Sequence, residues 1–224
     1  MHKAKILALG SVMAASLVAS SAALAEVSAN IAATSNYIWR GVSQTGNAAA
    51  VQGGIDWNHD SGFYVGTWTS TLGGDLGYEL DGYLGFGNEI GEFGYDVGYI
   101  YYAYPVQEDV DFSEVYLSGS WKWLELGLAY TVDGQAPDGS AFIGGDMYYY
   151  AGLSFDLPQD WGLGLTLGSY NFDADSSTNE LNYVHYQVAV TKGDFTFAID
   201  DNDLKDTAGE NTDPLVSVSW STTF

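Results

Sequence analysis

Apolar side chains recur at every second position through most of the chain after residue 25, and this alternation limits the possible folds more than any other feature. The run 93–101, FGYDVGYIY, is one example, with an aromatic or aliphatic residue at each odd position. A period of two residues is typical of β-strands with one apolar and one polar face, because successive side chains point to opposite sides. We count about twelve such runs, so the sequence predicts an all-β protein of about twelve strands.

The composition excludes several classes of protein. The chain has 224 residues, with 6 Lys and Arg against 29 Asp and Glu, a formal net charge of −23 and no Cys. A disordered acidic chain is excluded, because 46% of the residues are hydrophobic and 15% are aromatic. A nucleic-acid-binding protein is excluded as well, since phosphate contacts need cationic side chains. Abundant Gly and Tyr, with very little Lys and Arg, also argue against a helical enzyme.

The first 25 residues have the pattern of a secretory signal peptide. Two lysines precede an apolar stretch over 6–18, and the segment 23–25, Ala-Leu-Ala, ends with the small residues that signal peptidase accepts. A membrane-anchoring helix is the alternative, but the apolar stretch is shorter than the ~20 residues that span a bilayer. We therefore predict a cleaved signal peptide over 1–25 and one mature domain over 26–224, which keeps 4 basic and 29 acidic residues.

Two architectures fit many alternating strands: a soluble barrel or sandwich with its apolar faces inside, and an outer-membrane barrel with its apolar face towards lipid. Most runs approach the ~9–11 residues that cross a membrane, whereas strands of soluble proteins average ~5–6. Long and short connections also alternate, as in outer-membrane barrels, where the long ones are extracellular. The predicted long connections are 41–47, 105–111, 133–146, 173–180 and 200–213, and the short ones are 58–62, 88–92, a break near 122–124, 156–160 and 192–194. We predict a transmembrane antiparallel up-and-down β-barrel in the outer membrane of a Gram-negative bacterium.

The tryptophans and the C-terminus agree with this prediction. Five tryptophans are near predicted strand ends, where aromatic residues gather at membrane interfaces, and core packing is the alternative for each. These five are Trp39, Trp57, Trp123, Trp161 and Trp220. The chain ends in Phe224 after an alternating strand, which resembles the C-terminal signal that barrel-assembly machinery reads. We expect contacts with this machinery and with outer-membrane lipid and lipopolysaccharide.

Five segments carry a family resemblance. They are 35–44 (SNYIWRGVSQ), 52–55 (QGGI), 61–68 (SGFYVGTW), 94–105 (GYDVGYIYYAYP) and 114–116 (EVY). These segments resemble the TorF family of proteobacterial porins, most specifically over residues 26 to 120. The resemblance implies an outer-membrane barrel that forms a pore, in a family whose function is poorly defined, and it implies no catalytic residues.

The sequence offers little for catalysis or metal binding. The mature chain has His59 in a predicted turn and His185 on the polar face of a strand, and no distinctive serine motif accompanies His185. An outer-membrane hydrolase is therefore the least favoured alternative. The acidic segments 173–175 and 200–203 have oxygen ligands for Ca²⁺ but do not match an EF-hand loop. We predict no catalytic residues, no metal site and no cofactor.

About twelve strands at ~4.8 Å spacing and ~40° tilt give a barrel of roughly 12 Å radius, which lies between small filled barrels and wide porins. The alternation places charged residues on the lumen-facing side: Arg40, Asp56, Glu79, Asp81, Asp96, Glu114 and Glu125. Carboxylates that face a water-filled lumen favour cations, so we predict a porin for small cations or polar solutes. A structural or adhesive barrel with a plugged lumen, which acts through the acidic connections 133–146 and 200–213, is the alternative.

Arg40 is the single arginine, and the sequence leaves two positions open for it. In the first, Arg40 lies near the outer end of the first strand, with Trp39 facing lipid, and reaches into the upper lumen to pair with a carboxylate. The candidate partners are Glu79, Asp81 and Glu114. In the second, Arg40 lies at the rim and contacts lipid headgroups.

Overall fold

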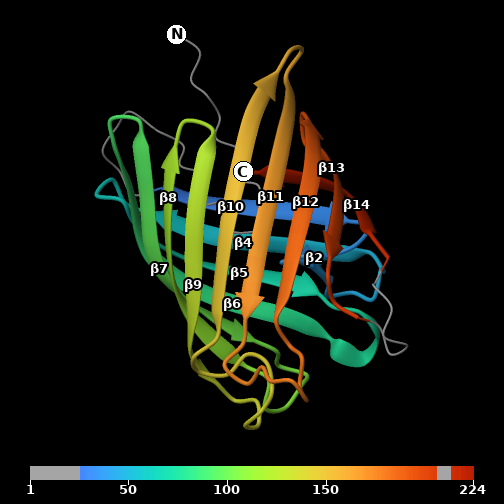
Figure 1. The fold of residues 1–224 in the computed structure, drawn as a ribbon. Coiled ribbons are helices and arrows are strands. Elements are labelled where there is room, and N and C mark those ends of the chain that lie inside the picture. Colours follow the sequence, from blue (N-terminus) through green and yellow to red (C-terminus); the bar gives the residue numbers. More distant parts are fainter. Residues whose placement is uncertain (1–25, 206–212) are drawn as a thin grey trace.

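The computed structural model forms a closed antiparallel β-barrel and describes residues 26–205 and 213–224 (Figure 1). The predicted signal peptide over 1–25 lies outside the described residues, and so do positions 206–212 of the acidic connection predicted over 200–213. Among the described residues, no helix is long and apolar enough to cross a membrane.

Twelve strands of the described chain close the barrel, as the alternation predicted. Strands that follow one another around the barrel pair antiparallel, and β1 pairs with β14 to complete the ring, so the barrel has no unpaired edge. The barrel strands are β1 (Glu26–Thr34), β4 (Ala50–Asn58), β5 (Phe63–Thr71), β6 (Tyr78–Ile90), β7 (Phe93–Ala103), β8 (Phe112–Trp121), β9 (Leu124–Gly134), β10 (Met147–Leu157), β11 (Trp161–Asn171), β12 (Tyr183–Lys192), β13 (Phe195–Asn202) and β14 (Leu215–Thr223). A separate two-stranded sheet consists of β2 (Ile38–Trp39) and β3 (Val42–Ser43), and a 3₁₀ turn, η1 (Gly74–Leu76), precedes β6.

The outer surface of the barrel is apolar, and much of its inner face is polar. In β5, for example, Phe63 and Val65 are exposed on the outside, whereas Tyr64 between them is buried. A soluble barrel has the reverse arrangement, and an apolar exterior that extends around the whole barrel is suited to contact with lipid. The transmembrane β-barrel predicted from the alternation is therefore confirmed.

Long connections gather at one end of the barrel and short turns at the other. The long ones are 35–49, 72–77, 104–111, 135–146, 172–182 and the connection between β13 and β14, of which 203–205 and 213–214 are described, and the short ones are 59–62, 91–92, 122–123, 158–160 and 193–194. In Figure 1 the long connections drawn in yellow and orange lie at the bottom, opposite the short turns at the top. We call the end with the long connections the outer end and the other the turn end.

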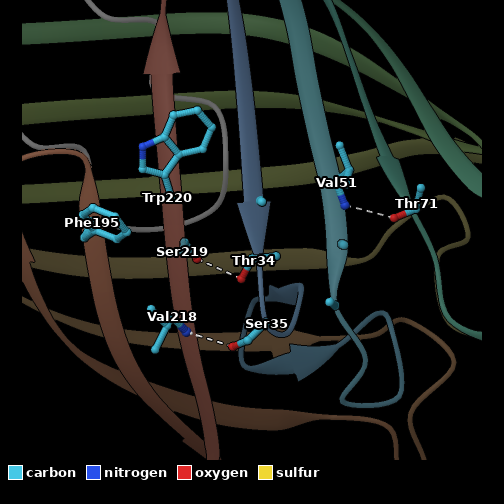
Figure 2. Close-up of a pocket in the computed structure, with 11 residues that line it drawn as sticks. Thr34, Ser35, Val51, Thr71, Phe195, Val218, Ser219 and Trp220 are labelled. Carbon is cyan, nitrogen blue, oxygen red and sulfur yellow. Dashed lines mark hydrogen bonds between the residues drawn. The ribbon is translucent and has the colours of Figure 1, made fainter.

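The first strand is shorter than the sequence predicted, because β1 ends at Thr34. Figure 2 shows this end of the strand, where Ser219 Oγ donates to Thr34 Oγ1 at 2.8 Å and the Val218 N–H donates to Ser35 Oγ at 2.9 Å. Beyond Ser35 the chain leaves the barrel wall and turns into the barrel. The groove drawn in the same view lies on the apolar outer face and therefore outside the lumen.

The prediction for Trp39 is wrong. Its side chain was expected on the lipid side of the first strand, but it is buried inside the barrel, because residues 35–47 fold inwards instead of continuing β1. The other four predicted interfacial tryptophans lie in or beside the ends of barrel strands: Trp57 in β4, Trp123 beside β9, Trp161 in β11 and Trp220 in β14.

Candidate functional site

Residues 35–47 form a hairpin inside the barrel, which we call the luminal hairpin. Its strands β2 and β3 are joined by Arg40 and Gly41, whose φ angles are 48° and 79°. Two positive φ values are typical of the two-residue turns that suit the twist of a hairpin, and such turns favour glycine. Arg40 has a conformation that residues other than glycine rarely adopt, so its side-chain contacts must stabilise it.

Arg40 pairs with Glu114 inside the barrel. Its Nη1 and Nη2 donate to Glu114 Oε1 and Oε2, both at 2.7 Å, and the two residues are only 8% and 1% exposed. The hydroxyls of Tyr102 and Tyr170 donate to the same carboxylate at 3.1 and 3.0 Å. Glu114 therefore accepts four hydrogen bonds, and loss of Arg40 would leave a buried carboxylate without its counter-charge.

Aromatic rings surround the Arg40 guanidinium group. Its Cζ lies 4.3 Å from the ring centroid of Trp39, 4.1 Å from that of Tyr148 and 5.1 Å from that of Tyr170. Faces of aromatic rings attract cations within about 6 Å. Four residues of the barrel wall either contact the guanidinium group or donate a hydrogen bond to Glu114, its partner. We call them the wall cage: Tyr102 of β7, Glu114 of β8, Tyr148 of β10 and Tyr170 of β11. All four lie near the outer end of their strands.

Further contacts hold the luminal hairpin in place. The Tyr37 hydroxyl donates to Glu79 Oε1 at 3.3 Å, and Asn202 Nδ2 donates to the carbonyl of Gly41 at 2.7 Å. A Cβ atom at position 41 would lie 2.4 Å from the Cβ of His185. Only a glycine fits at this point, so the tip of the hairpin packs tightly against β12.

An aromatic cluster covers the hairpin. Trp39 has its ring centroid 5.7 Å from that of Tyr102 and 5.8 Å from that of Phe142, which belongs to the long connection 135–146. Phe142 also stacks on Phe112, with centroids 4.8 Å apart. The connection 135–146 thus directs an aromatic side chain into the barrel, onto the hairpin.

Little space is left around Arg40. A cavity of about 20 Å³ lies between Arg40, Tyr148, His185 and Asp200, with room for about one water molecule. Together with the buried Arg40–Glu114 pair, this small volume means that hairpin and wall side chains fill the lumen at this level.

The lumen has a different lining near the turn end. Asp56, Asp96 and Glu125 are half-buried there, and each accepts a hydrogen bond from a tyrosine hydroxyl. The pairs are Tyr83 with Asp56, Tyr64 with Asp96 and Tyr150 with Glu125. Since these carboxylates keep part of their surface accessible, solvent reaches this part of the barrel.

The tyrosine rings near the turn end lie across glycines of the neighbouring strands. A Cβ atom at Gly85 would lie 2.3 Å from the Tyr64 hydroxyl, and one at Gly127 would lie 2.2 Å from the Tyr150 ring. Because the glycines have no side chain, the rings can lie along the wall instead of pointing towards the barrel axis. A side chain at position 85 or 127 would collide with the neighbouring tyrosine, so the placement of both rings depends on these glycines.

The predicted charged residues point inwards, and they form two groups. Those buried near the outer end are Arg40, Glu79, Asp81 and Glu114, and those half-buried towards the turn end are Asp56, Asp96 and Glu125. Two positions were considered for Arg40. In the structure its side chain lies inside the lumen and pairs with Glu114. That these residues line a conducting pore stays a prediction.

Three residues of the wall cage were absent from the prediction: Tyr102, Tyr148 and Tyr170. The sequence did contain a signal for them, because each occupies a polar-face position of its strand, where Gly, Ser, Thr and acidic residues are otherwise common. A large aromatic residue at such a position has to be accommodated inside the barrel.

His185, considered above for catalysis, belongs to the same region. Its Nε2 lies 2.8 Å from the Tyr148 hydroxyl, and its Nδ1 has no hydrogen-bond partner among the described residues. Across residues 26–205 and 213–224, no group of three or more His, Cys, Asp or Glu is arranged to hold a metal ion. The geometry around His185 is that of a packed lumen residue.

These features define the class of the fold, which is that of outer-membrane porins. A structure of the KdgM porin matches with a TM-score of 0.55 and 8% identity, over 88% of this chain and 98% of the porin. The NanC porin matches with a TM-score of 0.54 and 10% identity over the same shares. At such identities the likeness concerns the fold alone.

The chain belongs to the family described as "Bacterial protein of unknown function (Gcw_chp)", whose model matches residues 18–209. No curated protein is significantly similar in sequence. The resemblance to the TorF family stays a prediction, because the matching family carries a different description.

Proposed function

We propose that this chain is an outer-membrane porin through which small polar solutes diffuse passively, with a preference for cations. The observation that carries the proposal is the lumen lining, because an apolar exterior encloses inward-pointing carboxylates and Arg40 in the part of the chain that the structure describes. The shared fold of the KdgM and NanC porins supports a channel rather than an enzyme.

The cation preference rests on the charges near the turn end. The charge of Arg40 is balanced by Glu114 at 2.7 Å, whereas Asp56, Asp96 and Glu125 accept hydrogen bonds only from neutral tyrosine hydroxyls in the contacts described above. Carboxylates in a narrow aqueous passage with low-dielectric walls raise the local concentration of cations and repel anions. Cations that pass the turn end of the lumen would meet these three carboxylates.

Passage requires the luminal hairpin to move, because the hairpin fills the lumen near the outer end. Its strands β2 and β3 form their own sheet and are not part of the barrel ladder. The hairpin can therefore leave without breaking the strand pairing that closes the barrel. In this proposal the hairpin is the gate of the porin.

The other expected partners stay part of the proposal. Outer-membrane lipid and lipopolysaccharide fit the apolar exterior. The terminal Phe224 is 77% exposed, and its backbone N–H donates to the carbonyl of Ala29 at 2.8 Å. An exposed aromatic side chain at the end of the closing strand suits recognition by barrel-assembly machinery.

A plugged structural barrel is the second candidate, and the filled lumen around Arg40 favours it. Its acidic outer connections would then act on partners outside the cell. The two candidates differ in conductance, since a permanent plug passes no ions even when the hairpin contacts are removed.

The proposed function is tested by reconstituting the folded protein in planar lipid bilayers under a KCl gradient. We expect discrete conductance steps and a reversal potential whose sign shows that K⁺ permeates better than Cl⁻. Steps without cation preference would refute the selectivity. Absence of steps from both the native protein and the hairpin variants described below would leave the plugged barrel.

Replacing Gly41 with alanine is expected to open the channel more often. The new Cβ would collide with His185, and the backbone at φ 79° becomes strained. Overpacking costs about 1–3 kcal/mol, and this cost arises only while the hairpin is docked against His185. Single-channel recordings should show an open fraction that is larger by about tenfold or more.

Gly46→Ala is the matched control. Gly46 also has a positive φ, 59°, but a Cβ there meets nothing within 4 Å. It shares the backbone strain without the collision, so its effect should be clearly smaller. Equal open fractions for the two variants would show that the contact with His185 does not hold the hairpin.

A further inference from the structure

The four residues of the wall cage belong to barrel strands, and none of them belongs to the luminal hairpin. The carboxylate of Glu114 is held by the hydroxyls of Tyr102 and Tyr170, at 3.1 and 3.0 Å, and all three residues belong to barrel strands. The ring of Tyr148 lies on β10, beside the same space. No member of the cage is more than 5% exposed. If the hairpin withdrew, these four side chains would still be held by the barrel ladder.

The cage matches one chemical class of cation closely. The Arg40 guanidinium presents two parallel N–H donors to Glu114, at 2.7 Å each, and one of its faces lies over the Tyr148 ring at 4.1 Å. A planar cation with delocalised charge satisfies both contacts, because it is weakly hydrated and can bind a carboxylate through two hydrogen bonds. A small hydrated metal ion can bind a carboxylate but has no planar face to lie on the Tyr148 ring. The ring faces and the carboxylate therefore select guanidinium-type organic cations.

Arg40 fits this cage as a ligand that can be displaced. Its Nε is buried and has no hydrogen-bond partner in the part of the chain that the structure describes. Its backbone has a φ of 48°, which residues other than glycine rarely adopt. Both features make docking less favourable than the paired charges alone suggest. A free guanidinium compound would bring the same two donors without the backbone strain.

We propose that the wall cage is a binding site for guanidinium-type organic cations, and that Arg40 occupies it as an intramolecular ligand while the hairpin is docked. The inference deepens the proposed function, on which it rests, because it assigns a solute class to the lumen. A cation of this class would take the place of Arg40 when the hairpin withdraws, and so would select the open form.

Methylguanidinium binding to the folded, detergent-solubilised Arg40→Ala variant tests the proposal. We expect a saturable rise in melting temperature with added methylguanidinium, because a ligand that binds the folded state makes that temperature depend on concentration. Urea at the same concentration has the same planar shape without the charge, and it should give no rise. The native protein should give a much smaller rise, since Arg40 already fills the cage.

Two further variants keep the test decisive. Arg40→Ala combined with Glu114→Gln removes the carboxylate, so it should abolish the rise in melting temperature. Gly41→Ala displaces the hairpin with all cage residues intact, so it should show the rise at higher methylguanidinium concentrations than Arg40→Ala does. Absence of the rise in both Arg40→Ala and Gly41→Ala would overturn the site. So would an equal rise in the double variant, or an equal rise with tetramethylammonium, which has no N–H donors.

A conductance measurement separates this proposal from the proposed function. In bilayers, methylguanidinium should reduce the current through Arg40→Ala at concentrations that leave the double variant unaffected. If no variant conducts but methylguanidinium still stabilises Arg40→Ala, the porin function fails and the binding site stands. If the variants conduct but do not bind, the site fails and the porin function stands.

Discussion

Replacing Arg40 with alanine is expected to convert a mostly closed barrel into a mostly open one. The substitution leaves Glu114, which is 1% exposed, as a buried carboxylate without its counter-charge. Breaking a buried pair in this way costs roughly 3–5 kcal/mol. The hairpin can avoid this cost by undocking, which lets water reach Glu114. Undocking should therefore become more favourable by a factor of roughly 100 to 4,000, which single-channel recordings would detect as a higher open fraction.

The double variant Arg40→Ala with Glu114→Gln separates charge from packing. It removes both charges and keeps an amide in the place of the carboxylate, so much of the docked population should return. Lys122→Ala serves as the surface control, because Lys122 and Glu92 are exposed, 3.7 Å apart, and lie in two separate short turns far from the hairpin. Exposed pairs contribute about 0–1 kcal/mol. A double variant as open as Arg40→Ala would show that the ion pair does not hold the gate.

Neutralising the three carboxylates near the turn end is expected to remove most of the cation preference. The combined substitution is Asp56→Asn, Asp96→Asn and Glu125→Gln, and each amide oxygen can still accept the tyrosine hydrogen bond made by the carboxylate. Because lumen charges act at close range in a low-dielectric passage, the ratio of K⁺ to Cl⁻ permeability should fall towards about one. The ratio of K⁺ to Cl⁻ permeability should be measured from reversal potentials in the Arg40→Ala variant, because the hairpin is then expected to leave the lumen open.

An exposed set of carboxylates provides the matched control for this charge change. Asp60, Asp160 and Asp194 lie exposed in three of the short turns, and their replacement by asparagine changes the net charge by the same amount. Screening at about 0.1 M salt limits their influence to about 10 Å. The permeability ratio should stay close to that of the parent. An equal loss of selectivity in both triple variants would show that overall charge, and not the lumen lining, sets the preference.

Much of the barrel could be predicted from local pattern. The run 93–101 places its odd positions outside, and in the structure Phe93, Val97 and Tyr101 are exposed there. This succeeds because a strand alternates its side chains strictly, and a shift of one residue would turn every apolar group to the wrong side. The inward carboxylates followed from the same rule. The inward orientation of Asp96, for example, followed from its even position in that run.

The luminal hairpin could not be predicted in this way. Tyr37 and Trp39 resume the alternation of the first strand after Ser35, so the pattern continues past Thr34, where β1 ends. The Arg-Gly turn at 40–41 was a weak sign, since glycine favours the positive φ of a tight hairpin. Its partners are distant in the sequence, however, and the strongest of them, Glu114, is 74 positions from Arg40.

The sequence by itself therefore determined the barrel, its approximate strand number and the inward side on which the six predicted carboxylates lie, because these depend on a two-residue period within each strand. Only the tertiary structure decided that residues 35–47 enter the lumen, that Arg40 selects Glu114 among three candidate carboxylates, and that tyrosines of β7, β10 and β11 surround the pair. These outcomes depend on which inward-facing side chains lie opposite one another across the closed barrel. That arrangement is set by the whole ring of strands, and no single segment of the chain encodes it.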